Sequence, residues 1–231
     1  MGITAIELCK RYPVLYHMAS FGAWPSIAKH GLLSTESLLD LFEVPEPRRT
    51  ELLTTQRRAS VEIPHPMHGR AVIRDQKPLS AKNLARCLKG CSAEEWYRTL
   101  NERLFFWLDR ERLYTLMSAA EYVGKQHTVL QLDSASLVSK YAGRIMLAHM
   151  NTGNTRPYPH PRSPATFRSM SDYPYADRRQ LSDYSAVVEL TVIGGVPDAR
   201  DFVIRVEHAS IASSKYKTAE VIYTAALGGG C

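Results

Sequence analysis

Short apolar runs alternate along the chain with polar, turn-forming segments, and one of these runs contains an acid. Residues 186–193 read Ala-Val-Val-Glu-Leu-Thr-Val-Ile and are followed by Gly194-Gly195. A run this rich in β-branched residues and closed by glycines predicts a buried strand. Burial of an isolated carboxylate is costly or raises its pKa. Glu189 is therefore either a polar residue on the outer face of an edge strand or a functional group.

The same pattern predicts the other elements. Helices are expected where apolar residues recur every three or four positions behind Ser, Asp or Pro. The predicted helices are 25–30, 34–42, 48–58, 84–88, 93–100, 112–123 and 134–141. The predicted strands are 15–18, 104–108, 128–132, 144–150 and 202–206, with a final helix or strand at 217–224. Neither an internal repeat nor a linker is evident, which indicates one mixed α+β domain over residues 1–231.

Composition places the chain among ordinary globular proteins, with 231 residues of which 45% are hydrophobic and 23% charged. No apolar run approaches the roughly 20 residues that span a bilayer, so no membrane association is expected. The first ten residues lack the pattern of a signal peptide, which favours a cytoplasmic location. Four cysteines without a second Cys or His pair at ligand spacing indicate reduced thiols and no metal site.

Positive charge is concentrated in two segments. Residues 46–112 hold 14 Lys and Arg against 9 Asp and Glu, and residues 151–182 hold five Arg against two Asp. The planar guanidinium group of arginine can donate two parallel hydrogen bonds to a phosphate or to a base edge. The charge indicates either a surface for polyanions or the solvated surface of a mildly basic protein.

Four stretches, in the same order along the chain, resemble ADP-ribosyltransferases of the DarT type, bacterial toxins that attach ADP-ribose from NAD to nucleic-acid bases. The first stretch is Leu-Tyr-His-Met at 15–18 together with the predicted helix that follows and the Gly-Leu-Leu at 31–33. The second is Gln-Arg-Arg-Ala-Ser-Val at 56–61, and the third is Leu-Phe-Phe-Trp-Leu-Asp-Arg at 104–110. The fourth is the predicted strand at 184–192 together with Val196-Pro197. Departures lie at 19–23, where the family is more polar, and at Leu104 and Asp109, where it has proline. The resemblance therefore implies a distant branch.

The resemblance implies a fold, a co-substrate and site residues. The fold is an ADP-ribosyltransferase-like domain with a central split mixed or antiparallel β-core and flanking helices. The co-substrate is NAD, with Glu189 and Arg58 catalytic and with either Phe106 or Trp107 facing the cleft to stack on nicotinamide. The residues implied to contact NAD are Tyr16, His17, Met18, Leu32, Phe106, Trp107 and Arg110.

The segment 151–182 shows no clear period and holds five prolines. A loop this long is functional or disordered in most domains. The resemblance implies that this segment selects the acceptor. Its aromatic rings could stack on bases, and its arginines could bind phosphates or base edges. The alternative is a proline-rich surface loop without a partner. The candidate acceptor-binding residues are Arg156, Tyr158, Arg162, Phe167, Arg168, Tyr173, Tyr175, Arg178 and Arg179.

The expected chemistry follows from the bond that is broken. Release of nicotinamide builds positive charge on the ribose, which a carboxylate at Glu189 would stabilise. The same carboxylate would take a proton from the attacking base nitrogen. We therefore expect an NAD-dependent transferase that acts on single-stranded DNA or RNA, with an antitoxin as a partner implied by the resemblance. The alternatives are a transferase acting on protein, an RNA 2′-phosphotransferase, which Glu189 disfavours, and a nucleic-acid-binding module without catalysis.

Overall fold

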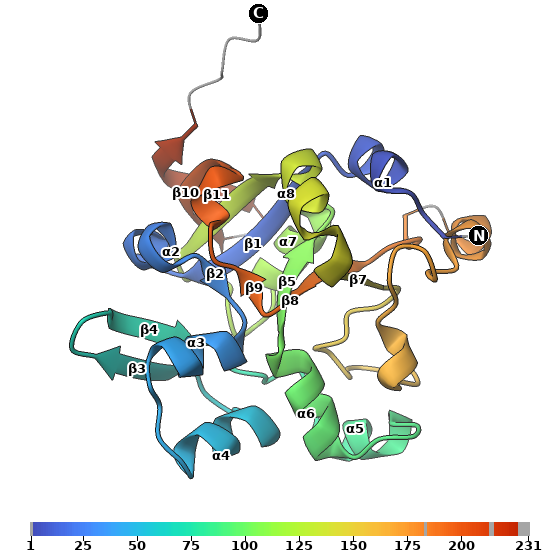
Figure 1. Ribbon diagram of the computed structural model, residues 1–231, viewed down its shortest axis with the longest axis horizontal. Coiled ribbons are helices and arrows are strands. Elements are labelled where there is room, and N and C mark those ends of the chain that lie inside the picture. Colours follow the sequence, from blue (N-terminus) through green and yellow to red (C-terminus); the bar gives the residue numbers. More distant parts are fainter. Residues whose placement is uncertain (1, 183, 213–214, 226–231) are drawn as a thin grey trace, which may run out of the picture.

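The computed structural model describes residues 2–182, 184–212 and 215–225. Its centre is a seven-stranded sheet with the order β11-β10-β6-β1-β5-β8-β7, in which all neighbouring strands run antiparallel (Figure 1). This confirms the predicted α+β class, a large antiparallel sheet flanked by helices. The strands of the sheet are β1 (Val14–Ser20), β5 (Arg103–Trp107), β6 (His127–Asp133), β7 (Ile145–Ala148), β8 (Glu189–Ile193), β10 (Val203–Ala212) and β11 (Lys215–Thr224).

Two small sheets lie beside the large one. Strand β2 (Leu32–Leu33) pairs with β9 (Gly195–Val196), and β3 (Val61–His65) forms a hairpin with β4 (Gly69–Ile73). The close approach of β2 and β9 requires glycine, because a Cβ on Gly195 would stand 2.4 Å from the carbonyl oxygen of Leu32. No strand was predicted between residues 58 and 84, so this hairpin is a difference from the sequence-based prediction.

Several helices begin directly after a capping side chain. Ser34, Ser80, Ser92, Asp109 and Asp133 each accept a hydrogen bond from a backbone N–H in the first turn of the helix that follows. The helices are α1 (Ala5–Arg11), α2 (Trp24–His30), α3 (Thr35–Leu41), α4 (Arg48–Thr54), α5 (Ala81–Cys87), α6 (Ala93–Asn101), α7 (Arg110–Met117), α8 (Ser134–Tyr141) and α9 (Tyr175–Leu181), with short 3₁₀ turns η1 (Ala142–Arg144), η2 (Pro164–Thr166) and η3 (Ala199–Asp201). Of these helices, α1 and α9 were not predicted.

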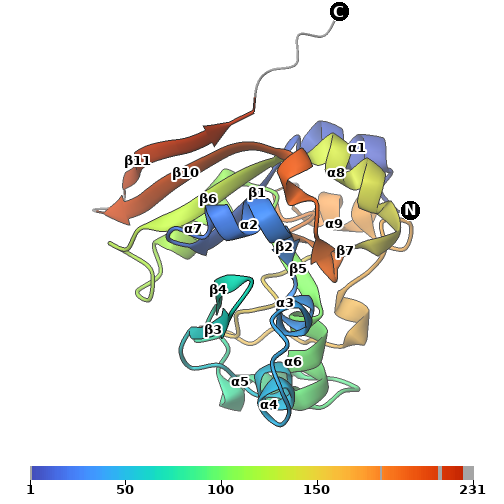
Figure 2. The same cartoon turned by 60° about the vertical axis from the view of Figure 1, so that its left-hand side comes forward.

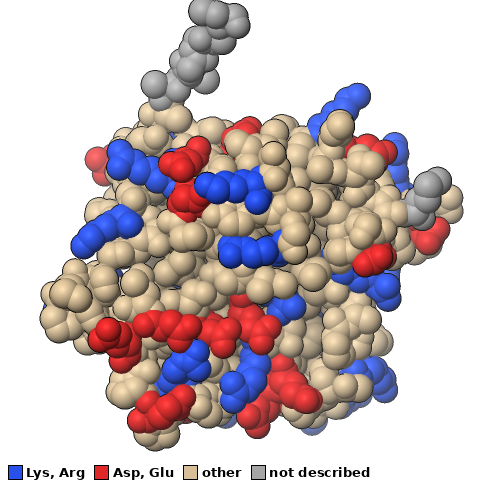
Figure 3. Space-filling model, viewed as in Figure 1, with Lys and Arg blue, Asp and Glu red and all other residues tan. Residues whose placement is uncertain are grey.

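The helices cover different parts of the sheet. Helices α1, α2 and α8 pack against the face that presents Leu104 and Phe106, and α7 packs against Met18 and Val129 of the other face. Helices α3 to α6 and the β3–β4 hairpin lie below the sheet (Figure 2). On the face shown in Figure 3, acidic and basic side chains interleave around α3 and α4, in agreement with the ion pairs of Arg49 with Glu36 and Asp40.

The sheet divides between β1 and β5. Those two strands are paired at one position, Tyr16 with Trp107, whereas β1 pairs with β6 along its whole length from Val14 to Ser20. The β-core is therefore split and antiparallel. One half is β11-β10-β6-β1, and the other is β5-β8-β7.

Candidate active site

A cavity of about 1120 Å³ opens at this split. Its walls come from β1, α2, β2, β4, β5 and α7, from the segment 151–156 and from Glu189. Figure 2 shows the β3–β4 hairpin below β1 and β2. The cavity is large enough for a ligand of dinucleotide size, since sites for drug-sized ligands occupy roughly 300–1,000 Å³.

Glu189 lies at this cavity and is 3% exposed. It is the first residue of β8, opposite Trp107 of β5 and Ala148 of β7, and not in the middle of a strand as the sequence predicted. Residues 186–188 are buried as expected, but they precede the strand. The carboxylate therefore lies at an end of the sheet, where a ligand can reach it.

The surroundings of Glu189 act on its charge in opposite directions. Burial raises the pKa of its carboxyl to about 7, although two hydrogen bonds from Thr152 and the charges of Arg162 and Arg112 oppose that rise. The backbone N–H and the hydroxyl of Thr152 donate to Oε2 at 3.2 and 2.7 Å. A carboxyl that titrates near neutral pH is suited to proton transfer.

A second buried acid shows what a structural carboxylate looks like in this fold. Glu207 on β10 is also 3% exposed, but it accepts hydrogen bonds from Arg205 at 3.0 Å, Tyr216 at 2.6 Å and Thr218 at 3.2 Å. Glu189 has no such ion pair within the described residues, and it faces the cavity. The polar-edge interpretation of Glu189 therefore fits the structure less well than a functional one.

His17 lies across the split from Glu189. Its Nδ1 is 2.9 Å from the carbonyl oxygen of Phe105 and its ring contacts Phe106 edge-on. Burial lowers the pKa of His17 to about 4, so the ring is neutral at physiological pH. Because a carbonyl oxygen only accepts, Nδ1 carries the proton and Nε2 is left as an acceptor.

Arginines make the cavity positive. Six arginines line it, against the three acids Asp75, Glu121 and Glu189. Some of them are held by the protein, as when Arg74 donates to the carbonyl of Met18 at 3.0 Å. The six are Arg57, Arg70, Arg74, Arg103, Arg112 and Arg156.

The structure places Arg58, the predicted catalytic arginine, outside the cavity. Arg58 is exposed and does not line the cavity, whereas its neighbour Arg57 is 8% exposed and does. Arg57 donates to the carbonyls of Arg74 at 3.0 Å and Leu52 at 2.7 Å, and to Oδ1 of Asn101 at 2.9 Å. The sequence Arg57-Arg58 offers no periodic signal that separates the two, and both lie in the irregular segment after α4.

The residues expected to contact NAD divide into two groups. His17, Met18, Leu32 and Trp107 line the cavity. Phe106 is 1% exposed in the main core, so Trp107 and not Phe106 faces the cavity. Tyr16 and Arg110 lie outside the lining, and the Arg110 guanidinium is 5.8 Å from the Tyr16 ring centroid.

The segment 151–182 is a packed part of the domain and ends in α9. Of the candidate acceptor-binding residues in it, Arg156 lines the cavity and Tyr158 is 78% exposed outside it. Arg168 and Arg179 are exposed and Arg178 is half-buried, all outside the cavity. The rings of Phe167, Tyr173 and Tyr175 are buried in the cores and cannot stack on bases. The prediction failed for these three because an aromatic ring is as good a core residue as a stacking platform.

Arg162 also has a structural position, being 1% exposed. Its guanidinium donates to the carbonyls of His160 at 2.9 Å and Asn151 at 3.2 Å, and also to that of Asn154. Those bonds fix the turn that presents Thr152 to Glu189. Thr152 was not predicted, although the run of small and polar residues 151–155, which begins three positions after the end of strand β7, is a signal that could have identified it.

Three further properties concern the described residues alone. Among them, no three His, Cys, Asp or Glu side chains are grouped as metal ligands. None of the helices in that part of the chain has the length and apolar character to cross a bilayer. Cys9, Cys87 and Cys91 are free thiols, and Cys231 lies outside the described residues.

Comparison with known proteins gives one match. Residues 13–203 match the model of a family of unknown function, DUF7002. No curated protein and no solved structure matches the chain.

Proposed function

This chain belongs to the DUF7002 family, and for it we propose the function of an NAD-dependent ADP-ribosyltransferase that modifies a base of single-stranded nucleic acid. One observation carries the proposal: Glu189, a buried acid with a pKa near 7, faces a positive cavity that His17 and Trp107 also line. These three residues come from separate stretches of the chain, each of which resembles the transferases of the DarT type.

The size and charge of the cavity support NAD as the ligand. NAD supplies the ADP-ribosyl group and loses nicotinamide. The arginines of the cavity, among them Arg74 and Arg112, would hold the pyrophosphate by charge-assisted hydrogen bonds. Nε2 of His17 can accept a hydrogen bond from a ribose hydroxyl, and the ring of Trp107 can stack on the face of a planar group.

Glu189 would carry the chemistry in its ionised form. Its carboxylate can accept a hydrogen bond from a ribose hydroxyl and stabilise positive charge that develops on the sugar. Because its pKa is near 7, it can also take the proton that the acceptor nitrogen loses. The carboxyl is buried apart from the side that lines the cavity, and the hydroxyl of Thr152 holds it in place.

The biological setting is part of the proposal. Because bulky modification of the bases in a cell's own nucleic acid would block their pairing, we propose that the protein acts in the cytoplasm as a toxin, with an antitoxin as its partner. Intact protein should then be poorly tolerated on expression, whereas Glu189→Gln should be harmless. Equal growth of cells expressing either form would contradict the toxin proposal.

The function is tested by incubating the purified protein with labelled NAD and, separately, with single-stranded DNA, total RNA and bulk protein. We expect a mass increase on one nucleic acid and release of nicotinamide. The reaction rate of Glu189→Gln should be at least roughly a hundredfold lower. Glu220→Gln, at an exposed position of β11, is the control and should retain activity. Label on protein alone would contradict the proposal that nucleic acid is the acceptor, and absence of label from all three would contradict the proposed transfer reaction.

A further inference from the structure

The surface next to the cavity carries cations that have no acidic partner. Helix α5 and the segment 155–162 lie side by side, because hydrogen bonds join them at both ends. Thr155 accepts from the backbone N–H of Ser80 at 2.8 Å and from the Asn83 side chain at 3.0 Å, before and within the helix. At the other end, Arg162 bonds through its backbone to Cys87 and Lys89 at 2.8 and 2.7 Å.

The exposed side chains of this surface are basic or aromatic. Lys82, Arg86 and Lys89 follow one another at spacings of four and three, and all three are exposed. Lys82 and Arg86, four positions apart, lie on one side of α5, and Lys89 follows the end of the helix, where its backbone N–H donates to the carbonyl of Arg162. Arg156 and Tyr158 on the neighbouring segment are exposed as well, Tyr158 at 78%. We call these five residues the α5 surface.

The charge of the α5 surface is not neutralised. Residues 76–93 and 151–171 contain no Asp or Glu, and none of the four cations forms an ion pair within the described residues. The nearest acids along the chain have other partners, since Asp75 accepts from Ser60 at 3.2 Å and Glu94 lies 3.7 Å from Arg98. The arginines of α4 differ, because Arg48 and Arg49 are paired with acids.

The surface leads into the cavity. Arg156 belongs to both, and Asn154 and Pro78 beside it also line the cavity that contains Glu189. A chain of phosphates along α5 would therefore approach the buried acid. An exposed tyrosine next to unpaired cations is the combination that holds unstacked bases together with their backbone.

We propose that the α5 surface binds the single-stranded nucleic acid from which a base enters the cavity. This proposal rests on the proposed function for the identity of the acceptor. The cations would hold phosphates, and the ring of Tyr158 would stack on a base next to the one that is modified. The sequence pointed to Arg156 and Tyr158, but the three cations of α5 become part of the same surface only in the fold.

The test is fluorescence anisotropy with labelled dT20, rU20 and a 20-base-pair duplex at several salt concentrations. The triple variant Lys82→Gln, Arg86→Gln, Lys89→Gln should weaken single-strand binding at least tenfold at low salt. It should also reduce the slope of log affinity against log salt by about 2, since each phosphate contact contributes roughly 0.7. Tyr158→Ala should weaken binding roughly 5- to 100-fold, and Tyr158→Phe should restore it.

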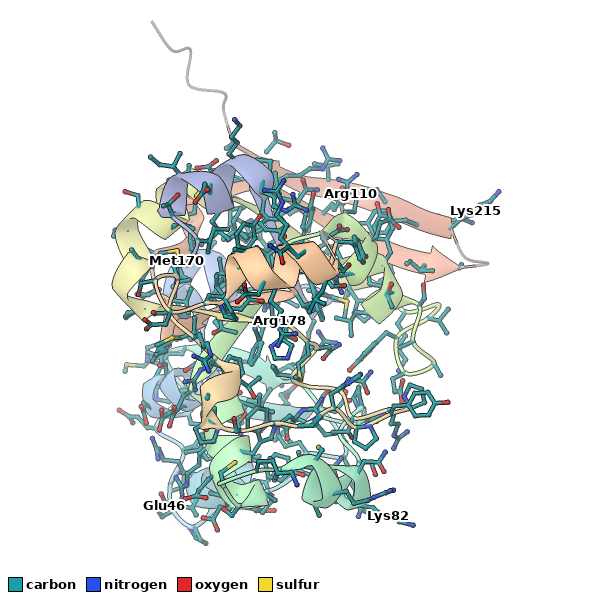
Figure 4. All side chains as sticks on the ribbon, turned by 90° about the vertical axis from the view of Figure 1, so that its right-hand side faces the viewer. Glu46, Lys82, Arg110, Met170, Arg178 and Lys215 are labelled. Atoms are coloured by element: carbon teal, nitrogen blue, oxygen red, sulfur yellow. The ribbon has the colours of Figure 1, made fainter. Side chains whose placement is uncertain are left out.

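A matched control removes the same charge elsewhere. Lys125, Lys215 and Lys217 are exposed cations, and Lys215 lies far from Lys82 in Figure 4. The triple Gln variant at those positions should bind like the unchanged protein. An equal loss in both triple variants, equally tight binding of the duplex, or no binding of any oligonucleotide would overturn the proposal. Equally tight binding of polyglutamate would point to an acidic polypeptide instead and would overturn it too.

The two proposals can fail separately. If the labelled-NAD reaction fails but oligonucleotide binding depends on the α5 surface, the transferase is wrong and the binding surface stands. If transfer to nucleic acid occurs and the α5 variant binds and modifies it as well as the unchanged protein, the surface is wrong and the transferase stands.

Discussion

Thr152 donates two hydrogen bonds to the same oxygen of Glu189, one from its backbone N–H at 3.2 Å and one from its hydroxyl at 2.7 Å. Both bonds favour the ionised carboxylate, whereas burial favours the neutral acid. Thr152, which opposes the effect of burial, lies on the turn after β7 and is 37 positions from Glu189 in the sequence.

Replacement of Thr152 should move the titration of Glu189. Thr152→Val keeps the shape but removes the hydroxyl, so the pKa of Glu189 should rise above its present value of about 7. The carboxyl carbon of Glu189, followed by ¹³C NMR against pH, measures the shift. Thr152→Ser keeps the hydroxyl and should titrate like the unchanged protein; equal titration of the Val variant would show that the hydroxyl bond has no influence.

Glu189→Gln should stabilise the fold at high pH. Folding raises the pKa of Glu189 from 4.5 to about 7, so the folded state binds the proton more tightly than the unfolded state. Stability therefore falls as pH rises from about 4.5 through 7, by about 3 kcal/mol in all. Urea unfolding should show Glu189→Gln more stable by up to about 3 kcal/mol at pH 8 and little changed near pH 4.5. A difference that does not depend on pH would contradict the raised pKa.

Arg57 and Arg58 should respond differently to truncation. Arg57→Ala leaves the carbonyl of Arg74 and the side chain of Asn101 without a buried donor and should cost about 2–4 kcal/mol of unfolding free energy. Arg58→Ala removes an exposed side chain and should change stability by less than about 0.5 kcal/mol. Denaturant unfolding of the two variants compares them directly, and equal losses would show that the bonds of Arg57 are not structural.

His17 should stay neutral down to unusually low pH. Burial holds its pKa at about 4, below the ordinary value of 6.5. The unfolded chain therefore takes up the proton first, and stability should fall as pH is lowered from about 6.5 to 4. In ¹H–¹³C spectra, the His17 signal, assigned with His17→Gln, should not shift between about pH 5.5 and 8. A midpoint near 6.5 would show that the ring is solvated.

Local patterns were sufficient for most of the sheet. The run of Leu104, Phe106 and Leu108 predicts β5 because a strand places alternate residues on one face, and these three are the buried residues of that stretch. Short elements with weaker signals were missed. The β3–β4 hairpin contains Pro64, which argues against a strand, yet Pro64 is accommodated in an isolated two-stranded hairpin.

The site was predictable only where one residue carried a strong signal. Glu189 stands out from an apolar run, and His17 was implied by the resemblance; both line the cavity. Thr152 is one polar residue among many in a turn, and its role depends on a contact with a distant strand. The burial of Phe167 and Tyr173 is likewise set by which core lies beneath the segment 151–182, which local sequence does not specify.

Because β1 and β5 are paired only at Tyr16 and Trp107, a ligand in the cavity would add contacts between the two halves of the sheet. His17 belongs to one half of the divided sheet, and Trp107 and Glu189 belong to the other, so a bound molecule would brace the two halves against each other. Binding would then slow amide hydrogen exchange in β6 and in β7 alike, far from any direct contact. Exchange protection that spreads through both halves would therefore report occupancy of the cavity, whatever reaction follows.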